Sequence, residues 1–102
     1  MKSDTDPMQM EAAAERASAL LKTLGHRDRL MILCSLAEGE RAVGELAEAL
    51  GLAQSALSQH LARMRAEGLV TSRRESQSVF YRLNDGDVRK LIESLYQIFC
   101  PT

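Results

Sequence analysis

One stretch of the chain concentrates side chains that can read the edges of base pairs. After Gly51, apolar Leu57, Leu61 and Met64 recur at helical spacing, which predicts a helix with one buried face. Its other face carries the polar and basic groups of Gln54, Ser55, Ser58, Gln59, His60 and Arg63. Amides and hydroxyls donate and accept hydrogen bonds, as base edges in the major groove require. We therefore expect the amide and hydroxyl side chains of Gln54, Ser55, Ser58 and Gln59 to contact bases. We expect His60 and Arg63 to contact phosphates or to make contacts at the flank of the helix; a packed or capping role for His60 is the alternative.

After Gly68, the spacing of the apolar residues changes from a helical pattern to a pattern typical of strands. Residues 69–74 and 78–83 are rich in β-branched and aromatic side chains and are separated by polar residues, which predicts a two-stranded hairpin. The hairpin carries side chains that suit DNA phosphates, namely Arg73, Arg74 and Gln77. The alternative is a solvated hairpin tip without a ligand.

Two cysteines, Cys34 and Cys100, are the other reactive groups. They are too few and too far apart for a zinc knuckle, and we expect reduced thiols. Taken singly, Cys34 beside Leu33 suits a small buried hydrophobe, and Cys100 suits a terminal thiol that Pro101 keeps out of helical conformation. We find no nucleophile–base–acid set, phosphate loop or metal motif, which predicts no catalytic residue, metal or cofactor and argues against an enzyme.

The neighbouring stretches supply the elements that must position these groups. Leu46, Ala47 and Leu50 at helical spacing, followed by Gly51, predict a short helix and a tight turn that leads into the polar helix. This is the helix-turn-helix pattern, and the hairpin behind it makes a winged helix-turn-helix. The alternative is a helical hairpin beside an unrelated β-ribbon.

Three further helices complete the expected order. The first is capped by Asp6 and ends at Gly25, the second occupies residues 26–37, and the last is capped by Asn84 or Asp85. The predicted fold is mainly α with a small β-hairpin, in the order α-α-α-α-β-β-α.

Both terminal helices carry apolar stripes that so small a chain cannot readily cover by itself. Pairing two subunits through them would bury this surface and present two recognition helices about 34 Å apart, one turn of DNA. We expect a homodimer whose interface includes Leu20, Leu21, Leu24, Leu91, Leu95 and Phe99. One alternative is a monomer whose terminal helices pack on each other, and another is a module that dimerises without binding DNA.

Length and charge agree with these expectations. The chain is short enough for one domain over residues 1–102, of which residues 1–6 are expected to be mobile. The net charge is −1, but residues 53–82 contain five arginines against two glutamates, so positive charge gathers in the polar helix and the hairpin. No apolar run is long enough to span a bilayer and we find no signal peptide, which predicts a cytoplasmic protein with no membrane partner.

Three short segments resemble the ArsR/SmtB family of winged-helix repressors. They are Val43-Gly44-Glu45-Leu46-Ala47, Gln54-Ser55-Ala56-Leu57-Ser58-Gln59-His60-Leu61 and Glu67-Gly68-Leu69-Val70. The resemblance implies a dimeric repressor that leaves double-stranded operator DNA when an inducer binds. The family's metal sites do not carry over, because residues 41–50 contain no cysteine and the last helix keeps Asp87 but no histidine. Ala42 and Ala53 stand where the family often has serine N-caps.

The two thiols resemble those of the reactive-sulfur-sensing branch of this family, the BigR/SqrR type and the related HlyU type. Leu33-Cys34, Ser78-Val79-Phe80-Tyr81 and Phe99-Cys100 carry this resemblance. It implies that a persulfide or polysulfide inducer joins Cys34 and Cys100 through extra sulfur atoms, after which DNA affinity falls. A disulfide needs Cα atoms about 4.4–6.8 Å apart, so thiols slightly too distant would distinguish persulfide from peroxide. The alternative is a repressor that senses a metal, a metalloid or a general oxidant through the same thiols.

Overall fold

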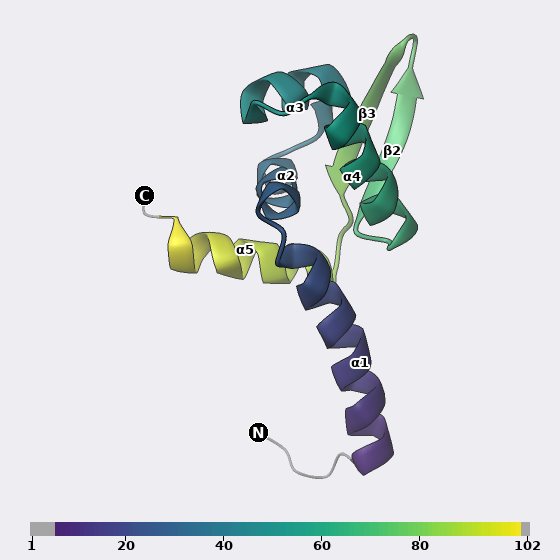
Figure 1. The fold of residues 1–102 in the computed structure, drawn as a ribbon, viewed down its shortest axis with the longest axis vertical. Helices are drawn as coiled ribbons and strands as arrows, with labels where there is room; N and C mark the ends of the chain where they lie inside the picture. Colours follow the sequence, from purple (N-terminus) through teal and green to yellow (C-terminus); the bar gives the residue numbers. More distant parts are fainter. Residues whose placement is uncertain (1–5, 101–102) are drawn as a thin grey trace. The chain divides into compact units, whose positions relative to one another are not determined.

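The computed structural model describes residues 6–100. The expectation that residues 1–6 are mobile therefore lies outside the described part of the chain except at Asp6, which caps the first helix. The elements, in order, are α1 (Pro7–Leu24), α2 (Arg27–Ala37), β1 (Arg41–Ala42), α3 (Val43–Leu50), α4 (Gln54–Ala66), β2 (Val70–Glu75), β3 (Ser78–Leu83) and α5 (Asp87–Phe99) (Figure 1). They form two compact units that divide between Leu30 and Met31, and each is described by itself. The expectation of a single domain stays a prediction.

The first unit is dominated by α1, whose bounds follow from local chemistry. The Asp6 carboxylate accepts hydrogen bonds from the backbone N–H groups of Met8 at 2.8 Å and Gln9 at 3.0 Å. Pro7 occupies the first helical position, where its missing N–H costs nothing. Gly25 follows the last turn, so both predicted ends of this helix are confirmed.

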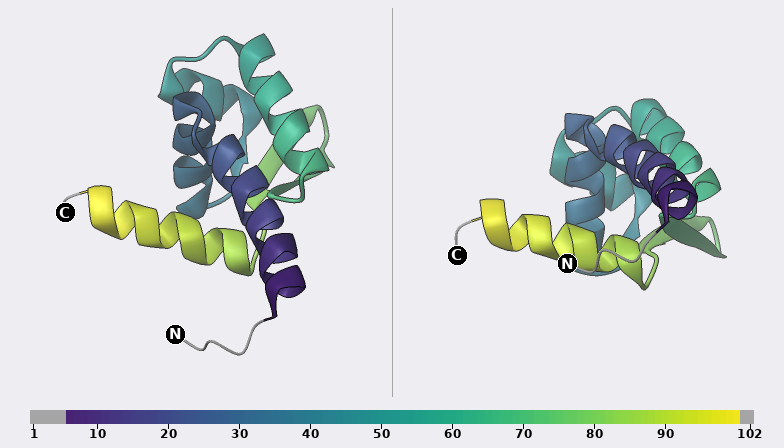
Figure 2. Two further views of the ribbon diagram at one scale, coloured as in Figure 1. Left: turned by 60° about the horizontal axis from the view of Figure 1, so that its bottom comes forward. Right: turned by 90° about the horizontal axis from the view of Figure 1, so that it is seen from below.

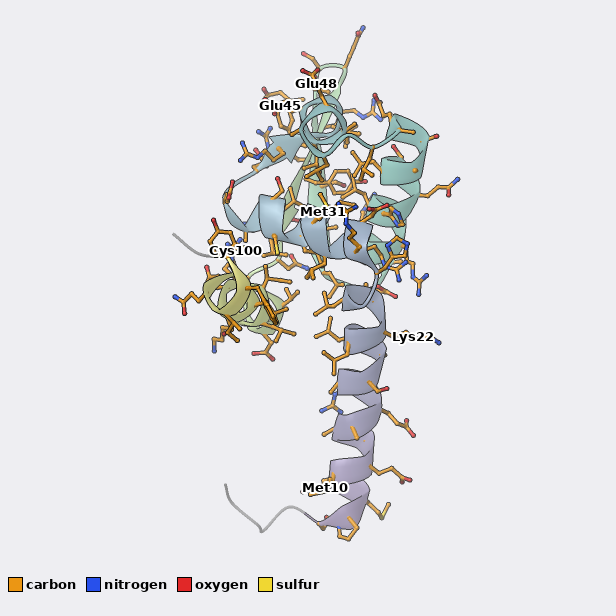
Figure 3. The ribbon with its side chains drawn as sticks, turned by 60° about the vertical axis from the view of Figure 1, so that its left-hand side comes forward. Met10, Lys22, Met31, Glu45, Glu48 and Cys100 are labelled. Atoms are coloured by element: carbon orange, nitrogen blue, oxygen red, sulfur yellow. The ribbon has the colours of Figure 1, made fainter. Side chains whose placement is uncertain are left out.

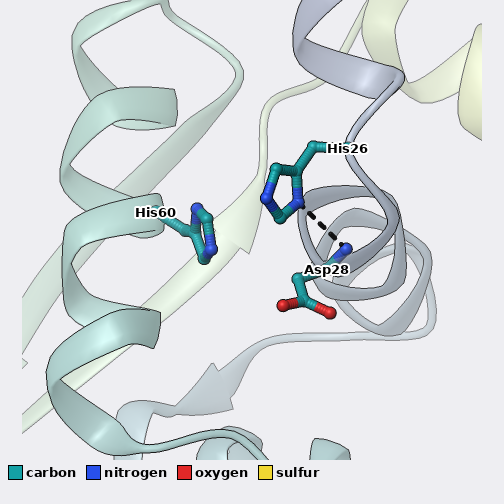
Figure 4. A group of neighbouring side chains, drawn as sticks. All are labelled: His26, Asp28 and His60. Carbon is teal, nitrogen blue, oxygen red and sulfur yellow. Dashed lines mark hydrogen bonds between the residues drawn. The ribbon is translucent and has the colours of Figure 1, made fainter.

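His26 directly precedes α2 and caps its first turn. The Nδ1 atom of His26 accepts a hydrogen bond from the backbone N–H of Asp28 at 3.2 Å, which makes His26 a capping residue (Figure 4). Nearby, Arg29 Nε donates to the carbonyl oxygen of Thr23 at 2.9 Å and ties the start of α2 to the end of α1. The side chains of Arg29 and Thr23 are both buried.

The second unit contains a three-stranded antiparallel sheet in the order β1-β3-β2. The hairpin register pairs Val70 with Leu83 and Glu75 with Ser78, as expected for a wing. The structure corrects the predicted element order, because the short strand β1 precedes α3 and pairs Ala42 with Phe80. Two residues are too few to show an alternating pattern, so only pairing with the distant β3 defines this strand.

The core of the second unit joins the helices to the sheet. The predicted apolar stripe of α4 is confirmed, since Leu57, Leu61 and Met64 are 0% exposed. Figure 2 shows α2, α3 and α4 grouped together, with α5 beside α2. The other buried apolar residues of this unit are Ile32, Leu33, Leu36, Leu46, Ala47, Leu69, Val70, Leu83, Val88 and Ile92. The winged helix-turn-helix fold is thus confirmed.

Among the described residues, no helix combines the length and the apolar character that crossing a bilayer would require.

Candidate functional site

The turn between α3 and α4 sets the direction of the polar helix. Gly51 ends α3 with φ 68°, in the left-handed region that side chains other than glycine enter at a cost. The backbone N–H of Leu52 then donates to the carbonyl oxygen of Ala47 at 3.0 Å, which closes the turn. This local geometry turns the chain sharply into α4.

The outward side of α4 carries the residues predicted to contact bases. Gln54, Ser55, Ser58 and Gln59 are all exposed, opposite the buried stripe. His60 is half-buried. Arg63 is exposed and forms an ion pair with Glu67 at 3.4 Å, one turn further along the helix.

A hollow of about 370 Å³ separates α4 from the wing. It brings together Gln54 and Ser58 of α4 with Gln77 at the wing tip, three of the predicted site residues. Ser55 and Gln59 do not line it. Sequence reasoning missed its remaining walls, which are Ala42, Val43, Gly44, Ser78, Val79 and Tyr81. Gly44 presents only backbone there, so its residue type gave no signal of this position.

The two neighbouring wing arginines have different surroundings. The guanidinium of Arg73 forms ion pairs with Glu40 at 2.7 Å and Glu75 at 3.0 Å. Arg74 is exposed and makes no ion pair within residues 6–100. Arg65, which sequence reasoning did not select, is likewise exposed and without an ion pair in that range. Arg74 and Arg65 therefore keep their charge available to a phosphate, whereas that of Arg73 is already matched.

Neither helix of the reading head has a side-chain N-cap. Ala42 and Ala53 precede α3 and α4 in extended conformation, and neither provides a capping hydrogen bond. At Ala42, the Glu45 carboxylate accepts from the backbone N–H at 3.1 Å, which is half of a capping box. Within the described residues, no side chain forms a comparable hydrogen bond with the backbone N–H of Ala53.

The thiols lie on facing elements of the second unit. Cys34 is a half-buried residue of α2, and Cys100 is exposed in extended conformation just after α5 (Figure 3). Both are free, without a disulfide. Burial raises the pKa of Cys34, and the charges of Cys100 and Glu38 raise this pKa further.

A hollow of about 480 Å³ opens beside Cys34, between α2 and α5. Its walls are Cys34, Ala37, Glu38, Glu93, Tyr96 and Gln97. This hollow leaves room for a small molecule beside Cys34. Sequence reasoning did not foresee the hollow, because its walls come from two helices far apart in the chain.

The residues predicted for a dimer interface differ in exposure. On α1, Leu21 is 58% exposed, Leu20 is half-buried and Leu24 is buried. On α5, Phe99 is 74% exposed, whereas Leu91 and Leu95 are half-buried. Sequence reasoning missed two further exposed residues, Tyr96 and Ile98, the latter 70% exposed.

Comparison with known proteins places these features in context. Residues 26–72 match the model of the arsR family of bacterial regulatory proteins. The transcriptional activator HlyU of Vibrio cholerae is 48% identical over 90% of this chain and 85% of that protein. The solved structure of reduced HlyU from the same species has a TM-score of 0.87, with 91% of this chain and 98% of that chain covered.

Two other solved structures are also similar. The transcriptional repressor BigR of Xylella fastidiosa is 44% identical with a TM-score of 0.85, covering 93% of this chain and 94% of that one. A homodimeric winged helix-turn-helix DNA-binding domain from Mycobacterium bovis is 33% identical with a TM-score of 0.77, covering 96% and 89% of the two chains.

Proposed function

Because the chain belongs to the arsR family of bacterial regulatory proteins, in the branch of BigR and HlyU, we propose that it is a dimeric operator-binding repressor whose release is triggered by reactive sulfur at Cys34 and Cys100. Its relatives are transcriptional regulators rather than enzymes. An activator and a repressor both occur among them, so the direction of control belongs to the proposal.

The observation that carries DNA binding is the hollow between α4 and the wing. Polar side chains of the recognition helix and the wing tip, Gln54, Ser58 and Gln77, meet around it. In the proposal, α4 enters the major groove, where Gln54, Ser55, Ser58 and Gln59 contact bases. Phosphates on either side are contacted by His60, Arg63, Arg74 and Gln77.

The proposed dimer forms through α1 and α5. Exposed apolar groups on each helix, such as Leu21 and Phe99, would otherwise remain in water. The Mycobacterium bovis neighbour is described as homodimeric, which supports the same assembly here. A two-fold dimer would present two α4 helices to half-sites about 34 Å apart. Sedimentation analysis tests the assembly, and a monomer at micromolar concentration would contradict it.

The proposed chemistry at the thiols is a transfer of sulfur. The Cys34 thiolate attacks the outer sulfur of a persulfide RSSH, takes that sulfur and its proton as Cys34–S–SH, and releases RS⁻. The same transfer converts Cys100 to its persulfide. Attack of one protein persulfide on the other then forms a trisulfide bridge and expels H₂S, with no external oxidant. The hollow beside Cys34 supports this route because it admits the donor.

The bridge would act on DNA binding through the helices it joins. Cys34 is part of α2 and Cys100 ends α5, so a covalent link restricts how these two helices can sit. If α5 forms the dimer interface, its displacement changes how the two α4 helices face the operator. A coupling of about 1–3 kcal/mol would suffice, since that corresponds to a 5- to 150-fold change in affinity.

The decisive experiment treats the reduced protein with glutathione persulfide or with hydrogen peroxide, identifies the products by mass spectrometry and measures operator binding of each. We expect a sulfur-bridged product, with loss of operator affinity, only after persulfide. Cys34→Ser and Cys100→Ser should each abolish the bridge and retain the DNA complex. Release of a double serine variant by persulfide would contradict the proposed sensor, and equal bridging by peroxide would indicate a general oxidant sensor instead.

A further inference from the structure

We propose that Arg73 is a positioning residue for operator binding: through Glu40, Glu75 and Phe80 it holds the wing in place, and it does not itself bind a phosphate. We call these four residues the Arg73 clamp. The inference rests on the proposed binding of operator DNA but not on the proposed thiol chemistry. It replaces the expectation, drawn from residue type alone, that Arg73 contacts the DNA backbone.

The contacts of the guanidinium carry the proposal. Arg73 Nε donates to Glu40 Oε2 at 2.9 Å and Nη2 donates to Glu40 Oε1 at 2.7 Å, a bidentate pair. Nη1 donates to Glu75 Oε2 at 3.0 Å. The side of the guanidinium that would bind phosphate through two parallel hydrogen bonds is therefore already occupied by Glu40.

One face of the guanidinium is covered as well. The Cζ atom of Arg73 lies 4.7 Å from the centroid of the Phe80 ring, within the range of a cation–π contact. Phe80 is the residue directly opposite Arg73 in the hairpin register. The stacked ring and the two carboxylates hold the side chain from three directions, which favours a single orientation over a mobile phosphate-seeking arm.

The clamp spans the whole sheet. Phe80 lies on the central strand β3, where it pairs with Arg73 of β2 on one side and with Ala42 of β1 on the other. Glu40 immediately precedes β1, so the Arg73–Glu40 pair joins the outer strand of the wing to the segment between α2 and α3. The wing is thereby tied to the segment that leads into the reading head.

Charge around the clamp also argues against a phosphate site. Two carboxylates, Glu40 and Glu75, surround the single positive charge of Arg73. The hydrogen bond from Arg73 lowers the pKa of Glu40, and the charges of Arg73 and Arg82 lower it further. Glu40 is therefore ionised at neutral pH, and a phosphate that approached Arg73 would be repelled by it. Arg74, the next residue, has no such carboxylate within the described chain.

The two roles predict opposite signs for one substitution. If Arg73 bound phosphate, Glu40→Gln would remove a competing negative charge and strengthen operator binding. If Arg73 positions the wing, the same substitution releases the clamp and weakens binding. The sign of the change in operator affinity caused by Glu40→Gln therefore distinguishes phosphate binding by Arg73 from positioning of the wing.

The experiment measures operator affinity by fluorescence anisotropy over a series of salt concentrations, with Arg74→Gln as the matched control. We expect Glu40→Gln and Arg73→Gln each to weaken binding about threefold or more, and the double variant to be no worse than Arg73→Gln, as for residues that act as one unit. The slope of log K against log salt should be unchanged by Arg73→Gln, whereas Arg74→Gln should make it shallower by about 0.9, the loss of one phosphate contact.

Lysine variants provide a second readout. Lysine keeps the charge but lacks the planar fork and the stacking face, so Arg73→Lys should lose most of the affinity that Arg73→Gln loses. Arg74→Lys keeps the charge that the proposed phosphate contact needs, so it should lose much less operator affinity than Arg74→Gln does. Circular dichroism and the melting temperature show whether each variant is folded. Arg74 suits the control because it is exposed and because lysine keeps its positive charge.

Three results would overturn the proposal. The first is tighter operator binding by Glu40→Gln. The second is a salt slope that Arg73→Gln makes shallower by as much as Arg74→Gln does. The third is an unchanged operator affinity of Arg73→Lys. Absence of salt-dependent operator binding by the unaltered protein would instead overturn the proposed function, and the clamp's role with it.

Discussion

Replacing Ala53 by serine should stabilise the recognition helix measurably. Ala53 precedes α4 with φ −61° and ψ 137°, an extended conformation in which a serine hydroxyl reaches the N–H groups of the first helical turn. The same chain shows this geometry in use, because Asp6 caps α1 at φ −73° and ψ 161°. A new cap contributes about 1 kcal/mol. For a chain of this size that corresponds to a rise in melting temperature of about 4–5 °C.

The assay is thermal unfolding followed by circular dichroism, at one protomer concentration because a dimer's melting temperature depends on it. Ala62→Ser is the matched control, since Ala62 is exposed in the interior of the same helix. There serine gains no cap and costs up to about 0.7 kcal/mol of helix propensity, so the melting temperature should fall slightly. If Ala53→Ser lowered the melting temperature as Ala62→Ser does, the argument from cap geometry would be refuted.

The same variant also tests how α4 meets DNA. Uncapped N–H groups at a helix start attract phosphate, and an operator phosphate at α4 would compete with a serine hydroxyl for them. We therefore expect Ala53→Ser to raise stability without raising operator affinity. A proportional rise in both would show that no phosphate uses these groups.

Three other outcomes are expected. Gln59→Ala should reduce discrimination at one base pair of the operator by about 1–3 kcal/mol, measured on single-base operator variants, and an equal loss on every sequence would contradict base contact. Burial and the charges of Cys100 and Glu38 raise the pKa of Cys34, so the rate of its alkylation by iodoacetamide should still increase with pH above the usual thiol range of about pH 8–9. Glu38→Gln should shift this pH profile of the alkylation rate to lower pH. An unshifted profile would show that the charge of Glu38 does not contribute to the raised pKa. Leu46→Ala, at a fully buried site, should cost about 2–5 kcal/mol in urea unfolding, and a loss below 1 kcal/mol would mean that the site collapses around the gap.

Much of the fold could be predicted from sequence because its signals are local. Asp6 and Gly25 lie within one turn of the helix ends that they define, and the spacing of Leu57 and Leu61 is itself the signal for a buried helical face. The strand β1 was missed because it consists of Arg41 and Ala42 alone, and only pairing with β3 makes it a strand.

The site was predicted less completely, because contacts between residues far apart in the sequence leave no local signal. The residue type of Arg73 suits a phosphate, but its guanidinium pairs with Glu40, which lies 33 positions earlier in the chain and shows no periodic relation to it. The proposed pairing of Cys34 with Cys100 could be expected only through the family resemblance, since nothing in their spacing indicates that α2 and α5 line one hollow. Residue types indicate what a side chain can do, whereas its partners decide what it does.

The junction between β1 and α3 contains no linker, because Ala42 ends the strand and Val43 begins the helix. The central strand β3 is held on both sides, so the hairpin cannot swing about its base without carrying α3 along. The proposed DNA-binding surface is therefore stiff and preshaped, and it is not a flexible arm. The hairpin therefore loses little conformational freedom when DNA binds, which lowers the entropic cost of forming the protein–DNA complex.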